Sequence, residues 1–199
     1  MCGLAGFISS ANSQASCLGD VVTSMADAVR HRGPDDNGIW VDPASGIALG
    51  HRRLSVLDPS AAGHQPMISA GGRYVIAFNG EVYNHLELRQ MLTASVCGLR
   101  WRGHSDTETL LCAFEHWGLQ KTLCRLVGMY AIALWDRQSN VLTLARDRMG
   151  EKPLYYTVTD DGWLVFASEL TALLAGLEDE PAINPEAVAD YFAYGYVPD

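Results

Sequence analysis

Alternating and helical patterns of apolar residues divide the chain into short strands and amphipathic helices. The apolar, glycine-rich stretch at residues 2–9 predicts a buried strand against which other backbone passes closely. Further strands are expected where turn residues bound apolar runs, at 38–41, 47–57, 74–78, 129–135, 141–145, 154–158 and 163–167. Helices are expected at 20–30, 85–96, 119–126, 168–177 and 185–194. Strands that arrive as hairpins, with helices in separate runs, predict an α+β fold rather than alternating βαβ units.

Two local patterns make more specific predictions. The run Ser105-Asp106-Thr107-Glu108 is a capping box ahead of apolar residues at helical spacing, and Gly118 can end the helix that it starts. Residues 31–38 are predicted to form a turn, because Pro34 fixes φ and Asn37-Gly38 tolerates positive φ.

Composition narrows the classes of function. The 199 residues include 14 Lys and Arg against 23 Asp and Glu, a net charge of −9, and 48% of them are hydrophobic. This composition is typical of a soluble globular protein. The negative net charge argues against nucleic acid or an anionic membrane as a partner, since binding to either requires basic patches. No stretch approaches the roughly 20 apolar residues of a membrane span, and the N-terminus lacks signal-peptide features. We therefore expect a cytoplasmic protein.

The cysteines indicate neither a disulfide framework nor a metal centre. They are five in number, at positions 2, 17, 97, 112 and 124, and none shows the C-x-x-C spacing of a zinc site. The six histidines are equally scattered. A metal-binding or redox protein is thus the less favoured alternative, and no residue is assigned as a metal ligand.

Cys2 directly follows the initiator methionine, and this position is chemically unusual. If Met1 is removed, one residue carries both a thiol and a free α-amine. The pKa of an α-amine is about 7.7 to 8.0 in model peptides, so a useful fraction of the amine is uncharged near neutral pH and can act as a base. Nucleophile and base then come from one residue. The alternative is a small buried residue without chemistry.

Three other positions have both a structural and a chemical interpretation. Asn79-Gly80 follows the strand expected at 74–78, where it is either a common turn dipeptide or a pair of donors for an oxyanion. Arg53 interrupts an apolar run and needs an anion, either in a salt bridge or in a bound carboxylate. Asp106 suits the first turn of its helix and still leaves a carboxylate for an ammonium group.

Several motifs, taken in order, resemble the glutaminase domain of glutamine-hydrolysing asparagine synthetases. They are Met1-Cys2-Gly3, Arg30-His31-Arg32-Gly33-Pro34-Asp35, Arg53-Leu54-Ser55-Val56-Leu57-Asp58, Phe78-Asn79-Gly80-Glu81 and Ser105-Asp106-Thr107-Glu108. The resemblance continues at 128–136, 145–156 and 166–169, and covers essentially the whole chain. At one position two subtypes of the class differ. Sugar-phosphate amidotransferases have a segment similar to His-Thr-Arg-Trp-Ala-Thr, whereas this chain has His51-Arg52-Arg53-Leu54-Ser55-Val56. The resemblance to the synthetase type is therefore preferred.

The resemblance implies a class II glutamine amidotransferase with an N-terminal-nucleophile hydrolase fold, an αββα four-layer sandwich with two antiparallel sheets. It implies that Cys2 is the nucleophile, that Asn79 and Gly80 form the oxyanion hole, and that L-glutamine is the substrate. Arg53 would hold the α-carboxylate of glutamine and Asp106 its α-ammonium. The family's other glutamine-contacting positions correspond to Leu54, Ser55, Val56, Leu57 and Glu81.

The same resemblance divides the chain at residue 180. Residues 1–180 would form the amidotransferase domain, and 181–199 would lead into a C-terminal synthetase domain that uses the ammonia to amidate an adenylated carboxylate. The sequence has no phosphate-cradling glycine loop, so no cofactor is expected here, and ATP and Mg²⁺ would bind only in that further domain. The alternative is a catalytically silent docking or dimerisation module, and whether the chain forms a homodimer stays open.

Overall fold

The computed structural model describes residues 1–9, 17–179 and 181–198, and its centre is a pair of antiparallel sheets. The five strands of the first sheet lie in the order β2 (Asp36–Asp42), β3 (Ile47–Arg53), β1 (Gly3–Ile8), β9 (Leu164–Ala167) and β8 (Tyr155–Val158). The four strands of the second sheet lie in the order β4 (Met67–Ile68), β5 (Tyr74–Val82), β6 (Gly128–Asp136) and β7 (Val141–Arg146). Strands β1 and β3 of the first sheet contact β5 of the second.

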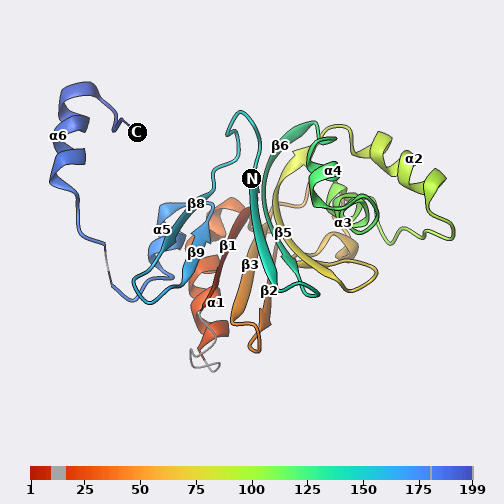
Figure 1. Cartoon of the computed structure of the whole chain (residues 1–199), viewed down its shortest axis with the longest axis horizontal. Coiled ribbons are helices and arrows are strands. Elements are labelled where there is room, and N and C mark those ends of the chain that lie inside the picture. Colours follow the sequence, from red (N-terminus) through yellow and green to blue (C-terminus); the bar gives the residue numbers. More distant parts are fainter. Residues whose placement is uncertain (10–16, 180, 199) are drawn as a thin grey trace.

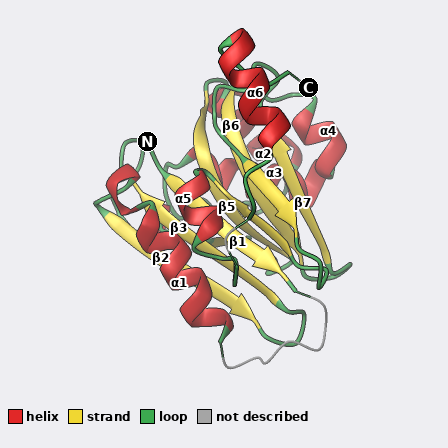
Figure 2. Cartoon of the chain, turned by 90° about the vertical axis from the view of Figure 1, so that its left-hand side faces the viewer, coloured by secondary structure: helices red, strands yellow, loops and turns green. Residues whose placement is uncertain are grey.

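Helices cover the outer face of each sheet, which completes a four-layer arrangement (Figure 1). Helices α1 (Leu18–Ala28) and α5 (Leu170–Leu174) pack on the first sheet and lie in front of it in Figure 2. The second sheet is covered by α3 (Asp106–Trp117), with α2 (His85–Ser95) and α4 (Leu119–Leu123) packed against that helix. The predicted α+β fold with two antiparallel sheets between helical layers is confirmed.

Three apolar layers hold this sandwich together. The central layer joins the two sheets through side chains of both, among them Leu49, Val75 and the fully buried Trp135. A second layer lies between the first sheet and its helices, and a third between the second sheet and α3. Alternate residues of β5 face opposite layers, Ile76 and Phe78 toward α3 and Val75 and Ala77 toward the other sheet, because strand side chains alternate.

The structure departs from the sequence predictions at the start of β2 and at the end of β3. The expected turn at 31–38 is only partly present, because Asn37 and Gly38 lie in β2 and pair with β3. Gly38 has no positive φ there; a Cβ would instead meet the His64 ring, 2.6 Å from its Nε2. Strand β3 ends at Arg53 rather than at residue 57, so the following segment is irregular.

Only one of the two hydrogen bonds of the predicted capping box is present at the start of α3. Ser105 Oγ accepts a hydrogen bond from the Glu108 backbone N–H at 3.2 Å. The Glu108 carboxylate does not return to Ser105; it accepts from the N–H groups of Arg102 and Gly103 at 2.7 and 3.1 Å. The cap therefore also fastens the loop before α3 to the helix. Gly118, with φ of 79°, ends the helix as predicted.

Helix α6 (Pro185–Tyr194) lies apart from the sandwich (Figure 1). None of the described residues from 181 to 198 is buried. The division of the chain at residue 180 stays a prediction. None of the helices in the described ranges is both long and apolar enough to cross a membrane.

Candidate active site

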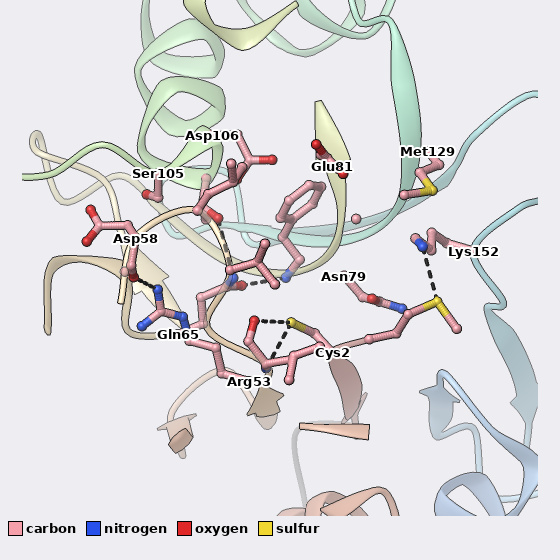
Figure 3. A pocket seen from close by; sticks show the side chains of 18 residues that line it. Cys2, Arg53, Asp58, Gln65, Asn79, Glu81, Ser105, Asp106, Met129 and Lys152 are labelled. Atoms are coloured by element: carbon pink, nitrogen blue, oxygen red, sulfur yellow. Dashed lines mark hydrogen bonds between the residues drawn. The ribbon is translucent and has the colours of Figure 1, made fainter. Parts of the chain in front are cut away.

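A cavity of about 170 Å³ opens where the start of β1, the end of β3, strand β5 and the start of α3 come together (Figure 3). Cavities of this size hold small organic molecules. Its wall includes nearly all of the predicted site residues: Cys2, Arg53, Leu54, Val56, Leu57, Asn79, Gly80, Glu81 and Asp106. The tertiary structure thus brings together residues that are more than 100 positions apart in the sequence.

Cys2 lies at the beginning of β1, where hydrogen bonds hold it from both sides. Its Sγ accepts from the backbone N–H of Leu54 at 3.4 Å. Its carbonyl oxygen accepts from Arg32 Nε at 2.9 Å, and Arg32 is ion-paired with Glu169 at 2.8 Å. The side chain is partly exposed and lines the cavity. The thiol is therefore held in position by these hydrogen bonds and remains accessible from the cavity.

Asn79 and Gly80 do not form a turn; both lie within β5 and pair with Ala131 and Tyr130 of β6. The turn interpretation is wrong because β5 continues to Val82, four residues beyond the predicted end. Asn79 is only 1% exposed, and its Nδ2 has no hydrogen-bond partner in the part of the chain that the structure describes. A buried amide donor without an acceptor is costly, so an acceptor that entered the cavity beside Nδ2 would be favoured.

The Gly80 N–H is aimed at the cavity by the register of β5. The Tyr130 N–H and C=O bond to Asp147 on the far side of β6, so Gly80 and Tyr130 form a pair without mutual hydrogen bonds. The Gly80 N–H therefore points away from β6, along the edge where the Phe78 and Val82 N–H groups bond to side chains. In the described part of the chain, no side chain accepts a hydrogen bond from the Gly80 N–H. A Cβ on it would approach the Tyr130 Cα to 2.8 Å.

Arg53 is buried, and its guanidinium lies against the loop that follows β3. Nη1 donates to the Ser60 carbonyl at 3.2 Å, and Nη2 donates to the carbonyl of Asp58. No ion pair of Arg53 is found among the described residues, so the salt-bridge interpretation has no support. A guanidinium has five N–H donors, and the two carbonyls use only some of them. The remaining donors can bind a carboxylate.

Asp58 ties this loop to the start of α3. Its carboxylate accepts from the His104 N–H at 2.6 Å and from the Ser60 hydroxyl at 2.6 Å. These bonds, the His104 N–H above all, lower the pKa of Asp58 despite its burial. Arg53 and Asp106 are thereby fixed on the same cavity wall.

Asp106 is 4% exposed, and its Oδ2 accepts from the Val82 N–H at 3.0 Å. Burial raises the pKa of Asp106, and the Val82 N–H only partly opposes this. A cation bound beside the carboxylate would favour its ionised form. The group is therefore suited to hold a substrate ammonium, in addition to its place in the first turn of α3.

Ser55 is the one predicted site residue that does not line this cavity. Its N–H donates to Asp35 Oδ2 at 2.8 Å, and the residue lines a separate hollow beside His64. The strand predicted for this segment would have alternated its side chains regularly. The irregular chain after Arg53 instead turns Leu54, Val56 and Leu57 toward the cavity.

Residues to which no sequence pattern assigned a role also build the site. His51 Nε2 lies 2.9 Å from the carbonyl oxygen of Phe78, and the Phe78 N–H donates to Gln65 Oε1 at 2.7 Å. Both partners hold the residue that precedes Asn79, and His51 does so across the two sheets. Complete burial lowers the pKa of His51 to about 4. Lys152 and Met129 also line the cavity, and no local pattern in the sequence signals either.

Within the described ranges, no group of three or more His, Cys, Asp or Glu side chains is arranged so that it could hold a metal ion. A cysteine thiol beside two free amide donors is instead typical of enzymes that cleave amides through a covalent thioester. The two antiparallel sheets, with Cys2 immediately before the central strand β1, have the arrangement expected for the fold of an N-terminal-nucleophile hydrolase.

The chain belongs to the glutamine amidotransferase domain family, whose model matches residues 1–199. It is 37% identical over 200 residues to asparagine synthetase [glutamine-hydrolyzing] 1 of Bacillus subtilis, covering 100% of this chain and 30% of that protein. It is 40% identical over 215 residues to a putative asparagine synthetase [glutamine-hydrolyzing] of Mycobacterium tuberculosis, covering 100% of this chain and 32% of that protein. The chain thus spans about a third of the length of these relatives.

A solved structure shows the same fold. The chain is similar to glutamine phosphoribosylpyrophosphate amidotransferase of Bacillus subtilis, with a TM-score of 0.71 and 20% sequence identity. The match covers 87% of this chain and 43% of that one. The predicted αββα sandwich of an N-terminal-nucleophile hydrolase is confirmed.

Proposed function

We propose that this chain hydrolyses L-glutamine to glutamate and ammonia, with Cys2 as the nucleophile after removal of Met1. The observation that carries the proposal is the buried amide nitrogen of Asn79, a residue that lines the cavity with Cys2, because this nitrogen has no hydrogen-bond partner among the described residues. A structural asparagine would satisfy this donor within the protein. A donor reserved for an entering oxygen is what an oxyanion hole requires.

In the first step, the α-amine of Cys2 takes the thiol proton and the sulfur attacks the γ-carboxamide carbon of glutamine. The carbonyl oxygen becomes an oxyanion, which accepts hydrogen bonds from Asn79 Nδ2 and the Gly80 N–H. The carbon–nitrogen bond then breaks, and the α-ammonium of Cys2 gives its proton to the departing nitrogen, which leaves as ammonia. Water hydrolyses the resulting thioester, which releases glutamate and restores the thiol.

The unreactive end of glutamine is held at the other side of the cavity. The free donors of Arg53 bind the α-carboxylate, and the Asp106 carboxylate binds the α-ammonium. Leu54, Val56 and Leu57 contribute apolar wall, and Glu81 adds a second carboxylate. These contacts fix the amide between Cys2 and Asn79, because the carboxylate and ammonium are bound at a set distance from it.

We further propose that the ammonia serves an ATP-dependent amidation of an adenylated carboxylate in a synthetase domain of the same chain. The names and greater lengths of the similar asparagine synthetases support this step. ATP and Mg²⁺ would bind in that domain.

The test is a glutaminase assay on protein whose intact mass shows that Met1 has been removed. Turnover of glutamine should be abolished by Cys2→Ala, with circular dichroism unchanged, since alanine removes only the partly exposed thiol and keeps the backbone contacts of residue 2. Asn79→Ala should lower kcat by roughly 10²–10³ with little change in KM. Activity in protein that retains Met1 would contradict the mechanism, because an amide nitrogen is not a base.

Asn79→Asp decides between an oxyanion donor and a purely structural role. It keeps the size of the side chain and replaces the amide donor by a carboxylate, which opposes the developing negative charge. Turnover should fall at least as far as in Asn79→Ala. Near-parental turnover would overturn the oxyanion assignment and favour a purely structural role for Asn79.

A further inference from the structure

Lys152 is a buried cation in the wall of the active-site cavity for which the reaction described above has no use. It is 5% exposed, and in the view of Figure 3 it lies on the opposite side of Cys2 from Arg53. Its Nζ contacts the Met1 sulfur at 3.2 Å, and this is the only partner of the ammonium in the described part of the chain. A thioether is a weak acceptor, so the charge is poorly compensated.

The backbone around Lys152 is built to hold it there. The Asp147 carboxylate accepts hydrogen bonds from four backbone N–H groups, those of Tyr130, Met149, Glu151 and Lys152, at 3.0 to 3.2 Å. Burial opposes the charge on Asp147, but together these N–H groups lower its pKa. Arg146 Nε also donates to the Lys152 carbonyl at 2.7 Å. The position of Lys152 is thus a fixed property of the loop after β7.

Removal of Met1 changes what Lys152 faces. It takes away the sulfur and creates an α-amine on Cys2, which lies only a few covalent bonds from the position of that sulfur. An uncharged amine can accept a hydrogen bond from the lysine ammonium, whereas a charged one cannot and is repelled by it. Both effects favour the uncharged amine.

We propose that Lys152 is a positioning residue that keeps the Cys2 α-amine uncharged, and so able to take the thiol proton, in the processed protein. This rests on the proposed function. The same repulsion favours transfer of the proton from the α-ammonium to the leaving ammonia, so Lys152 acts on both proton transfers without touching the substrate.

The other charged groups around Cys2 have partners or substrate roles. These groups are the ion pair of Arg32 and Glu169, and the cavity residues Arg53, Asp58, Glu81 and Asp106. Arg32 is paired with a carboxylate, and Arg53 donates to two carbonyls. The carboxylates of Glu81 and Asp106 would favour a charged amine, and Lys152 opposes this effect.

The first experiment compares the pH dependence of glutaminase kcat/KM in the processed parent, Lys152→Met and Lys152→Arg. Methionine keeps the length and loses the charge, whereas arginine keeps the charge. The acid limb of the Lys152→Met profile should move to higher pH by about one unit, which is roughly a tenfold loss near pH 6.5 and little loss at pH 9. Lys152→Arg should follow the parent, and the KM for glutamine should change little.

The second experiment needs no activity, so it separates this proposal from the proposed function. In a Cys2→Ala background, which keeps a free α-amine, acetylation of the N-terminus by acetic anhydride is measured against pH by mass spectrometry. Lys152→Met should move the midpoint to higher pH, and Lys152→Gln replaces it if that variant does not fold. Unchanged midpoints overturn the proposal whatever the glutaminase activity. A raised KM with an unchanged pH profile also overturns it, because Lys152 would then bind substrate.

Discussion

Acidification should destabilise this fold through one histidine. His51 is fully buried between the sheets, and its Nε2 bonds to the Phe78 carbonyl, whereas its Nδ1 has no partner among the residues that the structure describes. Burial lowers its pKa from 6.5 to about 4, because the charged ring cannot be hydrated. Between these values the unfolded chain binds a proton that the folded chain does not, so stability falls as the pH falls from 6.5 to 4. The loss amounts to about 3 kcal/mol by pH 4.

The assay is urea unfolding followed by tryptophan fluorescence at several pH values from 7.5 to 4. His51→Gln removes the titrating ring, so the free energy of unfolding should lose about 3 kcal/mol less than the parent over this range. It should also start lower at neutral pH, since a packed ring is replaced. His116→Gln, at an exposed position of α3, is the matched control. Equal pH dependence in parent and His51→Gln would refute the reasoning.

Three further predictions concern the cavity and one surface ion pair. Arg53→Ala and Asp106→Asn should chiefly raise the KM for glutamine, because they contact its unreactive end; unchanged KM values would contradict the clamp. Gly80→Ala should lower the free energy of unfolding by about 1–3 kcal/mol in urea titrations, because a Cβ meets the backbone of β6. The hydrogen bonds of Arg73 lower the pKa of Asp136 to about 2, so the stability that they provide is lost as the pH falls from 3.8 to 2. Thermal unfolding of Arg73→Gln should show less of this acid loss, and an identical profile would argue against the pair.

Local sequence determined those features whose cause lies within a few residues. The Ser105 cap and the stop at Gly118 follow from hydrogen bonds and backbone preferences over one helical turn. Cys2 could be singled out because its chemistry depends only on its place after Met1. The roles of Arg53, Asn79 and Asp106 came from the resemblance of ordered motifs, and they stay predictions until the variants are measured.

Only the tertiary structure decided the features that depend on distant backbone. Asn79-Gly80 has the local preference of a turn, but pairing with β6 keeps both residues in an extended strand and aims the Gly80 N–H at the cavity. Asn37-Gly38 is held in β2 in the same way. Lys152 meets Met1 across 151 positions. Such contacts arise from sheet register and the packing of two sheets, which the order of residues along the chain does not display.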